Sequence, residues 1–156
     1  MMLRRFLVLL PFALVGCNST SAVEQGPIID CSTLATTLAD ADATLTTTPS
    51  GLKYRDQTVG TGGAFASGAT VSVRYAGCLT PSGARFDSNE SPAPVFTFKL
   101  GAGFVIKGFD EGLVGMKVGG RRQLVIPPAI GYGATANGPI PANSTLVFTI
   151  DAISTP

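Results

Sequence analysis

The chain contains no histidine and no tryptophan among its 156 residues, and only 13% of its residues are charged. Without histidine, a site lacks the side chain whose ordinary pKa lies nearest neutrality and the commonest protein ligand for metals. The Cys, Asp and Glu residues show no metal-ligand cluster along the sequence. We therefore expect a site that works through an apolar pocket, without a metal or cofactor, rather than through acid–base chemistry.

A strong charge of either sign is also missing. The chain has 11 Lys and Arg against 10 Asp and Glu, a net charge of +1. A protein that binds nucleic acid through its phosphates needs a basic surface, so nothing in this balance favours a nucleic-acid partner. The 19 glycines and 11 prolines instead indicate many turns, which suits a β-rich fold with short strands. The length allows one domain plus an additional segment.

The first residues have the pattern of an export signal. Arg4 and Arg5 precede an apolar stretch over residues 6–15, which is too short to span a bilayer. This stretch ends in Leu-Val-Gly-Cys17, which resembles the lipobox of bacterial lipoproteins. Residues 1–17 are therefore expected to be a lipoprotein signal with Cys17 lipidated, although an ordinary secretory signal with a chance Cys would share the pattern. The lipobox reading predicts a lipid anchor in the bacterial cell envelope, on the outer membrane facing the periplasm in a Gram-negative organism.

Two further cysteines, Cys31 and Cys78, remain once Cys17 is set aside. Exported compartments are oxidising, so these two can form one intramolecular disulfide. That bond would attach the N-terminal segment to the rest of the protein. Two separate thiols, or pairing between chains, are the alternatives.

Composition divides the remainder into a tether and a folded domain. Residues 18–49 are rich in Thr, Ala and Ser, and residues 32–45 carry leucines that could line a short helix. Pro49-Ser50-Gly51 is a turn and the expected boundary, so the domain is predicted over residues 50–156. Within it, alternating apolar residues predict strands at residues 52–57, 70–77, 85–88, 96–100, 121–126 and 146–150, a short helix at 109–116, and a long loop at 127–143.

Several ordered blocks of the domain resemble one protein family. VSVRYAG, GARFDS, FKLGAGFVIKGFDEGLVGMKVGGRRQLVIPP, GYGA and IPANSTLVFTI follow one another between about Leu52 and Ile153. In this order and spacing they resemble the FK506-binding protein (FKBP) type of peptidyl-prolyl isomerase. The resemblance implies an α+β fold, in which a curved antiparallel sheet of five or six strands wraps around one short helix.

The resemblance also implies a pocket and assigns its residues. Phe109 would form the floor, where many family members have Trp. Asp87 would lie at the rim, and the Ile106 N–H and Tyr132 hydroxyl would bind substrate carbonyls. The positions implied as catalytic are Tyr75, Asp87, Ile106 and Tyr132, and those implied as substrate-binding are Phe86, Phe96, Val105, Phe109, Ile140 and Phe148.

These residue types suit rotation about an X–Pro bond, which needs no nucleophile, metal or general base. The implied function is peptidyl-prolyl cis–trans isomerisation in exported proteins, through apolar desolvation and stabilisation of a substrate turn. The implied partners are proline-containing polypeptides and macrolide inhibitors such as FK506 and rapamycin. A non-catalytic chaperone that uses the same groove is the alternative. Arg121 and Arg122, by contrast, are expected to lie on a solvated strand face.

Overall fold

A computed structural model describes Cys31 and residues 45–156; the signal, the lipobox and all but the last residue of the possible helix at 32–45 lie outside the described residues. The described part contains seven strands, one α-helix and one 3-10 helix. In chain order these are β1 (Thr46–Thr47), β2 (Lys53–Thr58), β3 (Thr70–Leu79), β4 (Arg85–Ser88), β5 (Phe96–Lys99), α2 (Lys107–Leu113), β6 (Arg121–Ile126), η2 (Pro128–Ile130) and β7 (Leu146–Ser154).

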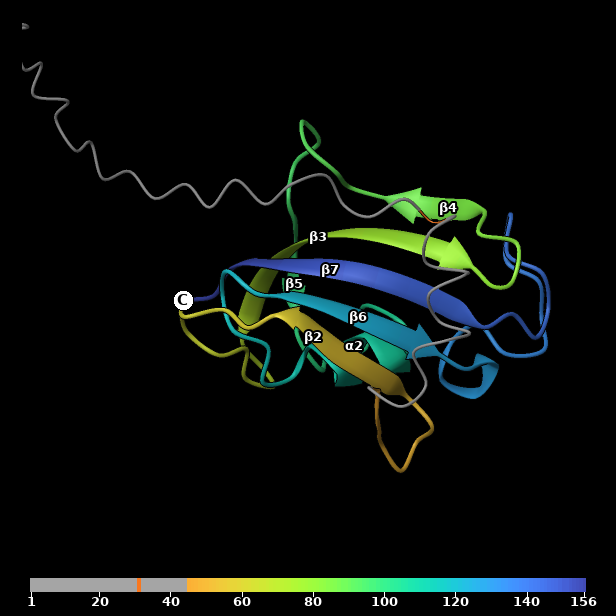
Figure 1. The fold of residues 1–156 in the computed structure, drawn as a ribbon, viewed down its shortest axis with the longest axis horizontal. Helices are drawn as coiled ribbons and strands as arrows, with labels where there is room; N and C mark the ends of the chain where they lie inside the picture. The colour runs from red at the N-terminus through yellow and green to blue at the C-terminus, as the bar shows by residue number, and fades with distance from the viewer. Residues whose placement is uncertain (1–30, 32–44) are drawn as a thin grey trace, which may run out of the picture.

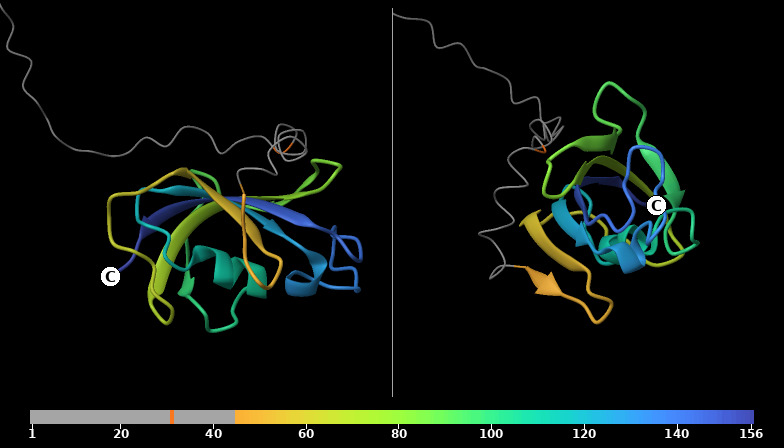
Figure 2. Two further views of the ribbon diagram at one scale, coloured as in Figure 1. Left: turned by 60° about the horizontal axis from the view of Figure 1, so that its bottom comes forward. Right: turned by 90° about the vertical axis from the view of Figure 1, so that its right-hand side faces the viewer.

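All the strands join in one antiparallel sheet. The strand order is β1-β2-β6-β7-β3-β4, and β5 pairs with the first half of β3 (Figure 1). The two longest strands, β3 and β7, lie side by side at its centre and pair from Ser72–Ser154 to Leu79–Leu146. The sheet curves over α2, so that it has a concave face toward the helix and a convex face away from it (Figure 2). The expected fold is therefore confirmed.

The helix lies close against β6 because two of its residues are glycines. A Cβ atom added at Gly112 would lie 2.5 Å from a methyl group of Leu124, and one added at Gly108 would lie 2.5 Å from a methyl group of Ile126. Between these glycines the buried side chain of Phe109 faces the core. The hydrophobic core therefore fills the space between α2 and the concave face of the sheet.

Several boundaries differ from the sequence prediction; β7, for example, extends to Ser154 and not only to residue 150. The helix begins two residues earlier than expected and ends at Leu113. The sheet begins with Thr46 and Thr47, inside the segment predicted as a tether, because these residues pair with β2 across a tight turn. Gly51 has a positive φ of 87° in that turn, and its N–H donates to the Thr48 carbonyl at 3.0 Å.

The convex face is held by a disulfide and an ion pair. Cys31 is bonded to Cys78 on β3, with a Cα–Cα distance of 5.7 Å, and packs with Val147 in a small buried cluster. Further along the sheet, Arg121 donates two hydrogen bonds to the Asp151 carboxylate, at 2.6 and 2.8 Å. The pairing of Cys31 with Cys78 is the one that the sequence favoured.

Arg122 corrects the expectation of a solvated strand face. Its residue is only 8% exposed and points to the concave side of β6. Its guanidinium donates two hydrogen bonds to Asp56, at 2.7 and 2.9 Å, and one to the Gly112 carbonyl at 2.9 Å. It also lies 4.8 Å from the ring centroid of Tyr54. Because neighbouring residues of a strand face opposite sides, Arg121 and Arg122 connect different layers of the protein.

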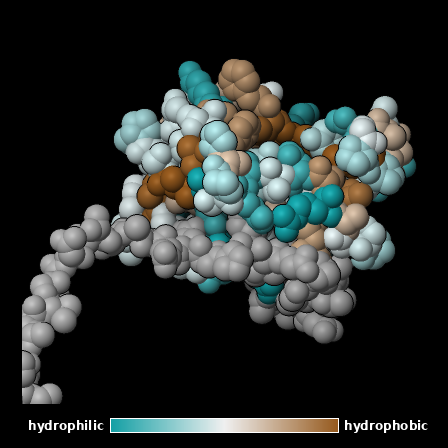
Figure 3. Space-filling view, turned by 90° about the horizontal axis from the view of Figure 1, so that it is seen from above, coloured by the Kyte–Doolittle hydropathy of each residue, from teal (hydrophilic) through white to brown (hydrophobic). Residues whose placement is uncertain are grey.

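Large exposed apolar side chains are scattered over the described surface. In Figure 3, hydrophobic residues lie in separate areas among hydrophilic ones. Within Cys31 and residues 45–156, no helix is long and apolar enough to cross a membrane. The most exposed of the large apolar side chains are Phe104, Val59 and Val114.

Candidate functional site

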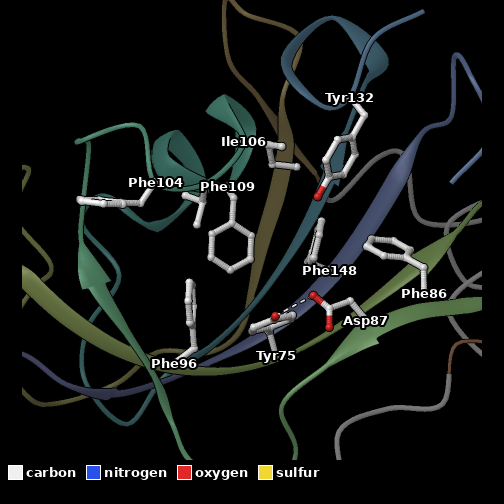
Figure 4. A pocket seen from close by; sticks show the side chains of 10 residues that line it. Tyr75, Phe86, Asp87, Phe96, Phe104, Ile106, Phe109, Tyr132 and Phe148 are labelled. Carbon is white, nitrogen blue, oxygen red and sulfur yellow. Dashed lines mark hydrogen bonds between the residues drawn. The ribbon is translucent and has the colours of Figure 1, made fainter. Parts of the chain in front are cut away.

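A pocket of about 180 Å³ opens on the concave side of the sheet, between α2, the ends of β3, β4, β5 and β7, and the loop after β6. Its lining is mainly aromatic, with a carboxylate and two tyrosine hydroxyls at the edge (Figure 4). Pockets for small ligands have this character, because apolar walls bind the ligand and a few polar groups fix its orientation. The lining residues are Tyr75, Phe86, Asp87, Phe96, Phe104, Val105, Ile106, Phe109, Tyr132 and Phe148.

Phe109 lies at the centre of the aromatic cluster. It projects from the first turn of α2 and is 4% exposed. Its ring centroid is 5.7 Å from that of Tyr75 and 5.1 Å from that of Phe148, both in edge-to-face arrangements. Phe98 of β5 supports it from behind at 6.1 Å. Edge-to-face contacts of this kind fix ring orientation, so Phe109 forms a rigid floor.

The walls come from three different strands. Phe86 of β4 contacts Phe148 of β7 edge-to-face at 5.5 Å, and Phe96 of β5 stacks on Phe98 at 4.9 Å. Gly77 of β3 lies under the first pair, and a Cβ there would come within 2.7 Å of the Phe148 ring and 2.8 Å of the Phe86 ring. The glycine therefore makes room for these two walls to meet.

Tyr75 and Asp87 form the polar rim. The Tyr75 hydroxyl donates a hydrogen bond of 2.7 Å to the Asp87 carboxylate. Burial, and then this hydrogen bond, raise the pKa of the Tyr75 hydroxyl above its ordinary value. The phenol therefore stays protonated at neutral pH and keeps the carboxylate turned toward the pocket.

Asn89 fixes the chain that follows this rim. Its side-chain oxygen accepts a hydrogen bond from the Tyr75 N–H at 2.7 Å, and its side-chain nitrogen donates to the Val73 carbonyl at 3.1 Å. Arg74 holds the same loop by donating to the Asn89 and Ala93 carbonyls. The loop between β4 and β5 is thus attached to β3, which places Asp87 and Phe96 on either side of Tyr75.

Two donors at the pocket have no partner within the described part of the chain. The Ile106 N–H precedes α2, and no hydrogen bond from it is found there. The Tyr132 hydroxyl also has no hydrogen-bond partner in the described part of the chain. Figure 4 shows it pointing toward the space between Phe109 and Phe148. Tyr132 is 37% exposed. These donors are therefore available to carbonyl groups of a bound molecule.

The structure brings together every residue that the resemblance assigned to the pocket except Ile140. Ile140 is 4% exposed, belongs to the hydrophobic core, and is not part of the pocket lining. Backbone hydrogen bonds of 2.9 Å in both directions hold it to Asn137. The structure adds Phe104, which the assignment omitted. The sequence signal for Phe104 was an aromatic residue directly after Gly101-Ala102-Gly103, a segment whose composition predicts an exposed turn.

No group of three or more His, Cys, Asp or Glu side chains within the described residues is placed to hold a metal ion. What the site presents to a ligand is an aromatic cavity, a carboxylate, and donors, among them the Ile106 N–H and the Tyr132 hydroxyl, that have no partner in the described part of the chain. These groups can bind and orient a ring with adjacent carbonyls.

A curved antiparallel sheet around one short helix, with an aromatic pocket between them, defines an FKBP-like domain. The FKBP-type peptidyl-prolyl cis-trans isomerase family matches residues 62–153, and the chain belongs to this family.

Similar proteins share this region. FK506-binding protein 4 of Chaetomium thermophilum is 53% identical over 100 residues, which cover 64% of this chain and 20% of that protein. The chain thus spans about a fifth of this curated relative. The crystal structure of AtFKBP13 superposes with a TM-score of 0.67 at 35% identity and covers 72% of this chain and 98% of that one. The crystal structure of a peptidyl-prolyl cis-trans isomerase of Pseudomonas syringae pv. tomato has a TM-score of 0.65 at 30% identity. The match covers 83% of this chain and 96% of that one.

Proposed function

We propose that this protein is a peptidyl-prolyl cis–trans isomerase that acts on exported polypeptides. The observation that carries the proposal is the aromatic pocket around Phe109 with unused donors at Ile106 and Tyr132. Family membership supports the same activity. The name of the Pseudomonas syringae relative states this activity for that protein.

The pocket suits the chemistry of amide rotation. Turning the X–Pro bond removes its resonance, which accounts for an uncatalysed barrier of roughly 18–20 kcal/mol. The twisted imide is less polar than the planar one, so an apolar, water-excluding surface favours it over the ground state. Phe109 would take the proline ring, with Phe148 and Tyr75 beside it. No bond between heavy atoms is made or broken.

The polar groups would orient the peptide. The Ile106 N–H and the Tyr132 hydroxyl would each donate to a carbonyl on one side of the proline, which holds the substrate in a turn. Asp87 would remain at the rim, held by Tyr75. Asp87 and the backbone at Ile106 are held before the substrate binds, which lowers the entropic cost of reaching the rotated geometry.

Macrolides such as FK506 and rapamycin are proposed to occupy the same cavity. The relative from Chaetomium thermophilum is named an FK506-binding protein. A macrolide that fills the space above Phe109 would exclude the proline ring, so inhibition should be competitive with substrate.

Exchange NMR on a short Leu-Pro peptide tests the proposed activity. The full chain would be kept in a mild detergent because of its apolar segment at 6–15, and cis–trans exchange would be measured with and without rapamycin. We expect rapid exchange that rapamycin suppresses. Peptide binding without faster exchange would point to a peptide-binding chaperone. If the peptide neither binds nor exchanges faster, the pocket has no function in proline recognition.

We further propose that the protein is lipid-anchored through Cys17 in the bacterial cell envelope. The Leu-Val-Gly-Cys pattern and the disulfide between Cys31 and Cys78, a bond typical of oxidising compartments, support this location. Metabolic labelling with a fatty acid would test it: the chain should incorporate label, Cys17→Ser should not, and Cys31→Ser should label normally. Labelling of Cys17→Ser would contradict the proposal.

A further inference from the structure

Phe104 is the large apolar side chain with the highest exposure in the described structure, at 73%. It lies in the loop between β5 and α2 and lines the pocket. A single exposed apolar side chain is common on protein surfaces, but this one lies at the pocket. Burial of its ring against a bound molecule would be favourable.

The loop that carries Phe104 is held in place. The Asp110 carboxylate of α2 accepts hydrogen bonds from the Gly101 N–H at 2.9 Å and the Gly103 N–H at 3.2 Å. Both glycines have positive φ values, 76° and 74°, which favour glycine. A fixed loop presents an aromatic ring to a ligand at low entropic cost.

The space beside Phe104 is open. A Cβ added at Gly103, the residue before Phe104, would meet no atom within 4 Å, and the Phe104 side chain itself is largely exposed. Figure 4 shows Phe104 at the far edge of the pocket, beyond Phe109 and on the side away from Tyr132 and Phe86. Phe96 lies below Phe104 and Phe109 in the same view, beside Tyr75. Phe104 therefore continues the aromatic lining past the space that a proline ring would fill.

A peptide that places its proline on Phe109 would cross the pocket from one edge to the other. One neighbour of the proline would then lie near Phe86 and Tyr132, and the other near Phe104 and the Ile106 N–H. Resting on the proposed isomerase function, we propose that Phe104 forms a subsite for an apolar side chain at one of the two positions flanking the proline. It would set substrate preference at that position and leave the other unaffected.

Exchange rates on three peptides would test this subsite. The peptides share their outer residues and carry Ala-Pro-Ala, Leu-Pro-Ala or Ala-Pro-Leu at the centre. They would be measured with the full chain, with Phe104→Ser, with the conservative variant Phe104→Leu, and with Val59→Ser. Val59 is 68% exposed and does not line this pocket, so it is a matched control for loss of an exposed apolar side chain.

We expect the wild-type protein to prefer Leu over Ala at one flanking position by about fivefold to tenfold in kcat/KM, the range for partial burial of a leucine. Phe104→Ser should abolish that preference, so that kcat/KM falls more on the Leu peptide of that flank than on Ala-Pro-Ala, and the Leu-to-Ala ratio at the other flank should stay unchanged. Phe104→Leu should restore most of the preference, and Val59→Ser should match the wild type.

The outcomes separate the subsite from the activity. If the wild type accelerates none of the peptides, the proposed isomerase function fails. If it accelerates Ala-Pro-Ala but Phe104→Ser changes neither flank preference, the subsite is wrong and the activity stands. Equal loss on all three peptides in Phe104→Ser would also overturn the subsite, because a specificity element must discriminate between them.

Discussion

The two faces of the sheet are both buried, but by different chemistry. On the concave face, aromatic rings around Phe109 enclose a pocket whose donors at Ile106 and Tyr132 are unused. On the convex face, Arg121 is bound to Asp151, and a disulfide closes over β3. Polar groups that bind one another contribute to the fold, whereas donors left open beside an apolar cavity are available to a ligand.

An unpaired polar group can bind a ligand only if a ligand can reach it. Gln123 Nε2 and Thr149 Oγ1 on the convex side are also buried and have no hydrogen-bond partner among Cys31 and residues 45–156, but they line no pocket described above. Tyr132, by contrast, is partly exposed and faces the cavity. From this comparison we expect mutations on the concave face to change turnover, and mutations on the convex face to change only the free energy of unfolding.

The largest effect is expected on the concave face, from Phe148→Ala. Phe148 is 5% exposed and contacts Tyr75, Phe86 and Phe109. Removing a buried aromatic ring costs about 3–5 kcal/mol of unfolding free energy. Urea unfolding would measure this loss, and exchange NMR on the folded fraction should show lower turnover as well. Normal turnover per folded molecule would show that Phe148 has no role in catalysis by the pocket.

Replacing both Cys31 and Cys78 by Ser should affect stability only. The bond joins residues separated by 47 positions, and loss of such a crosslink costs about 2–4 kcal/mol. The disulfide lies on the convex face, so kcat/KM should be unchanged below the unfolding transition. A fall in turnover equal to that of Phe148→Ala would break the distinction between the two faces.

Tyr132→Phe should reduce turnover modestly. It removes one hydrogen-bond donor worth about 0.5–1.5 kcal/mol, equivalent to roughly a twofold to tenfold loss in kcat/KM. Tyr54→Phe is the matched control, because Tyr54 keeps its ring beside Arg122 and does not line the pocket. If the two variants lose activity equally, the Tyr132 hydroxyl has no specific role.

The smallest effect is expected from pH. The chain has no histidine, and the Tyr75 hydroxyl has a raised pKa, so kcat/KM should be flat from about pH 6 to about pH 9. Above the ordinary tyrosine pKa of about 10, Tyr75 stays protonated in the folded chain but ionises in the unfolded one. Its contribution to stability should therefore be lost as pH rises above that value. A bell-shaped rate profile near neutrality would contradict this account.

The sequence predicted most strands and the pocket because their signals are local or ordered along the chain. Alternating residues placed β6 at its observed bounds, and β4 was also predicted over its observed residues, Arg85–Ser88. The pocket assignment for residues such as Phe86 and Phe148 came from the family resemblance, since periodicity alone would have placed Phe148 in the core.

Three features that the sequence did not reveal depend on how the chain packs in three dimensions. Arg122 looked like a surface residue because its partner, Asp56, is 66 positions away and on another strand. Ile140 is buried in the core by the fold of its own loop. Phe104 has no periodic pattern around it, and only the fixed turn held by Asp110 reveals that it lines the pocket.

The most direct test of the central claim is an amide chemical-shift titration of the isotope-labelled protein with a Leu-Pro peptide. The account predicts that shifts concentrate at Ile106, Phe109 and their neighbours around the pocket, and that Arg121 and Asp151 on the convex face stay unchanged. Shifts that cluster on the convex face while the Ile106 amide does not move would contradict it.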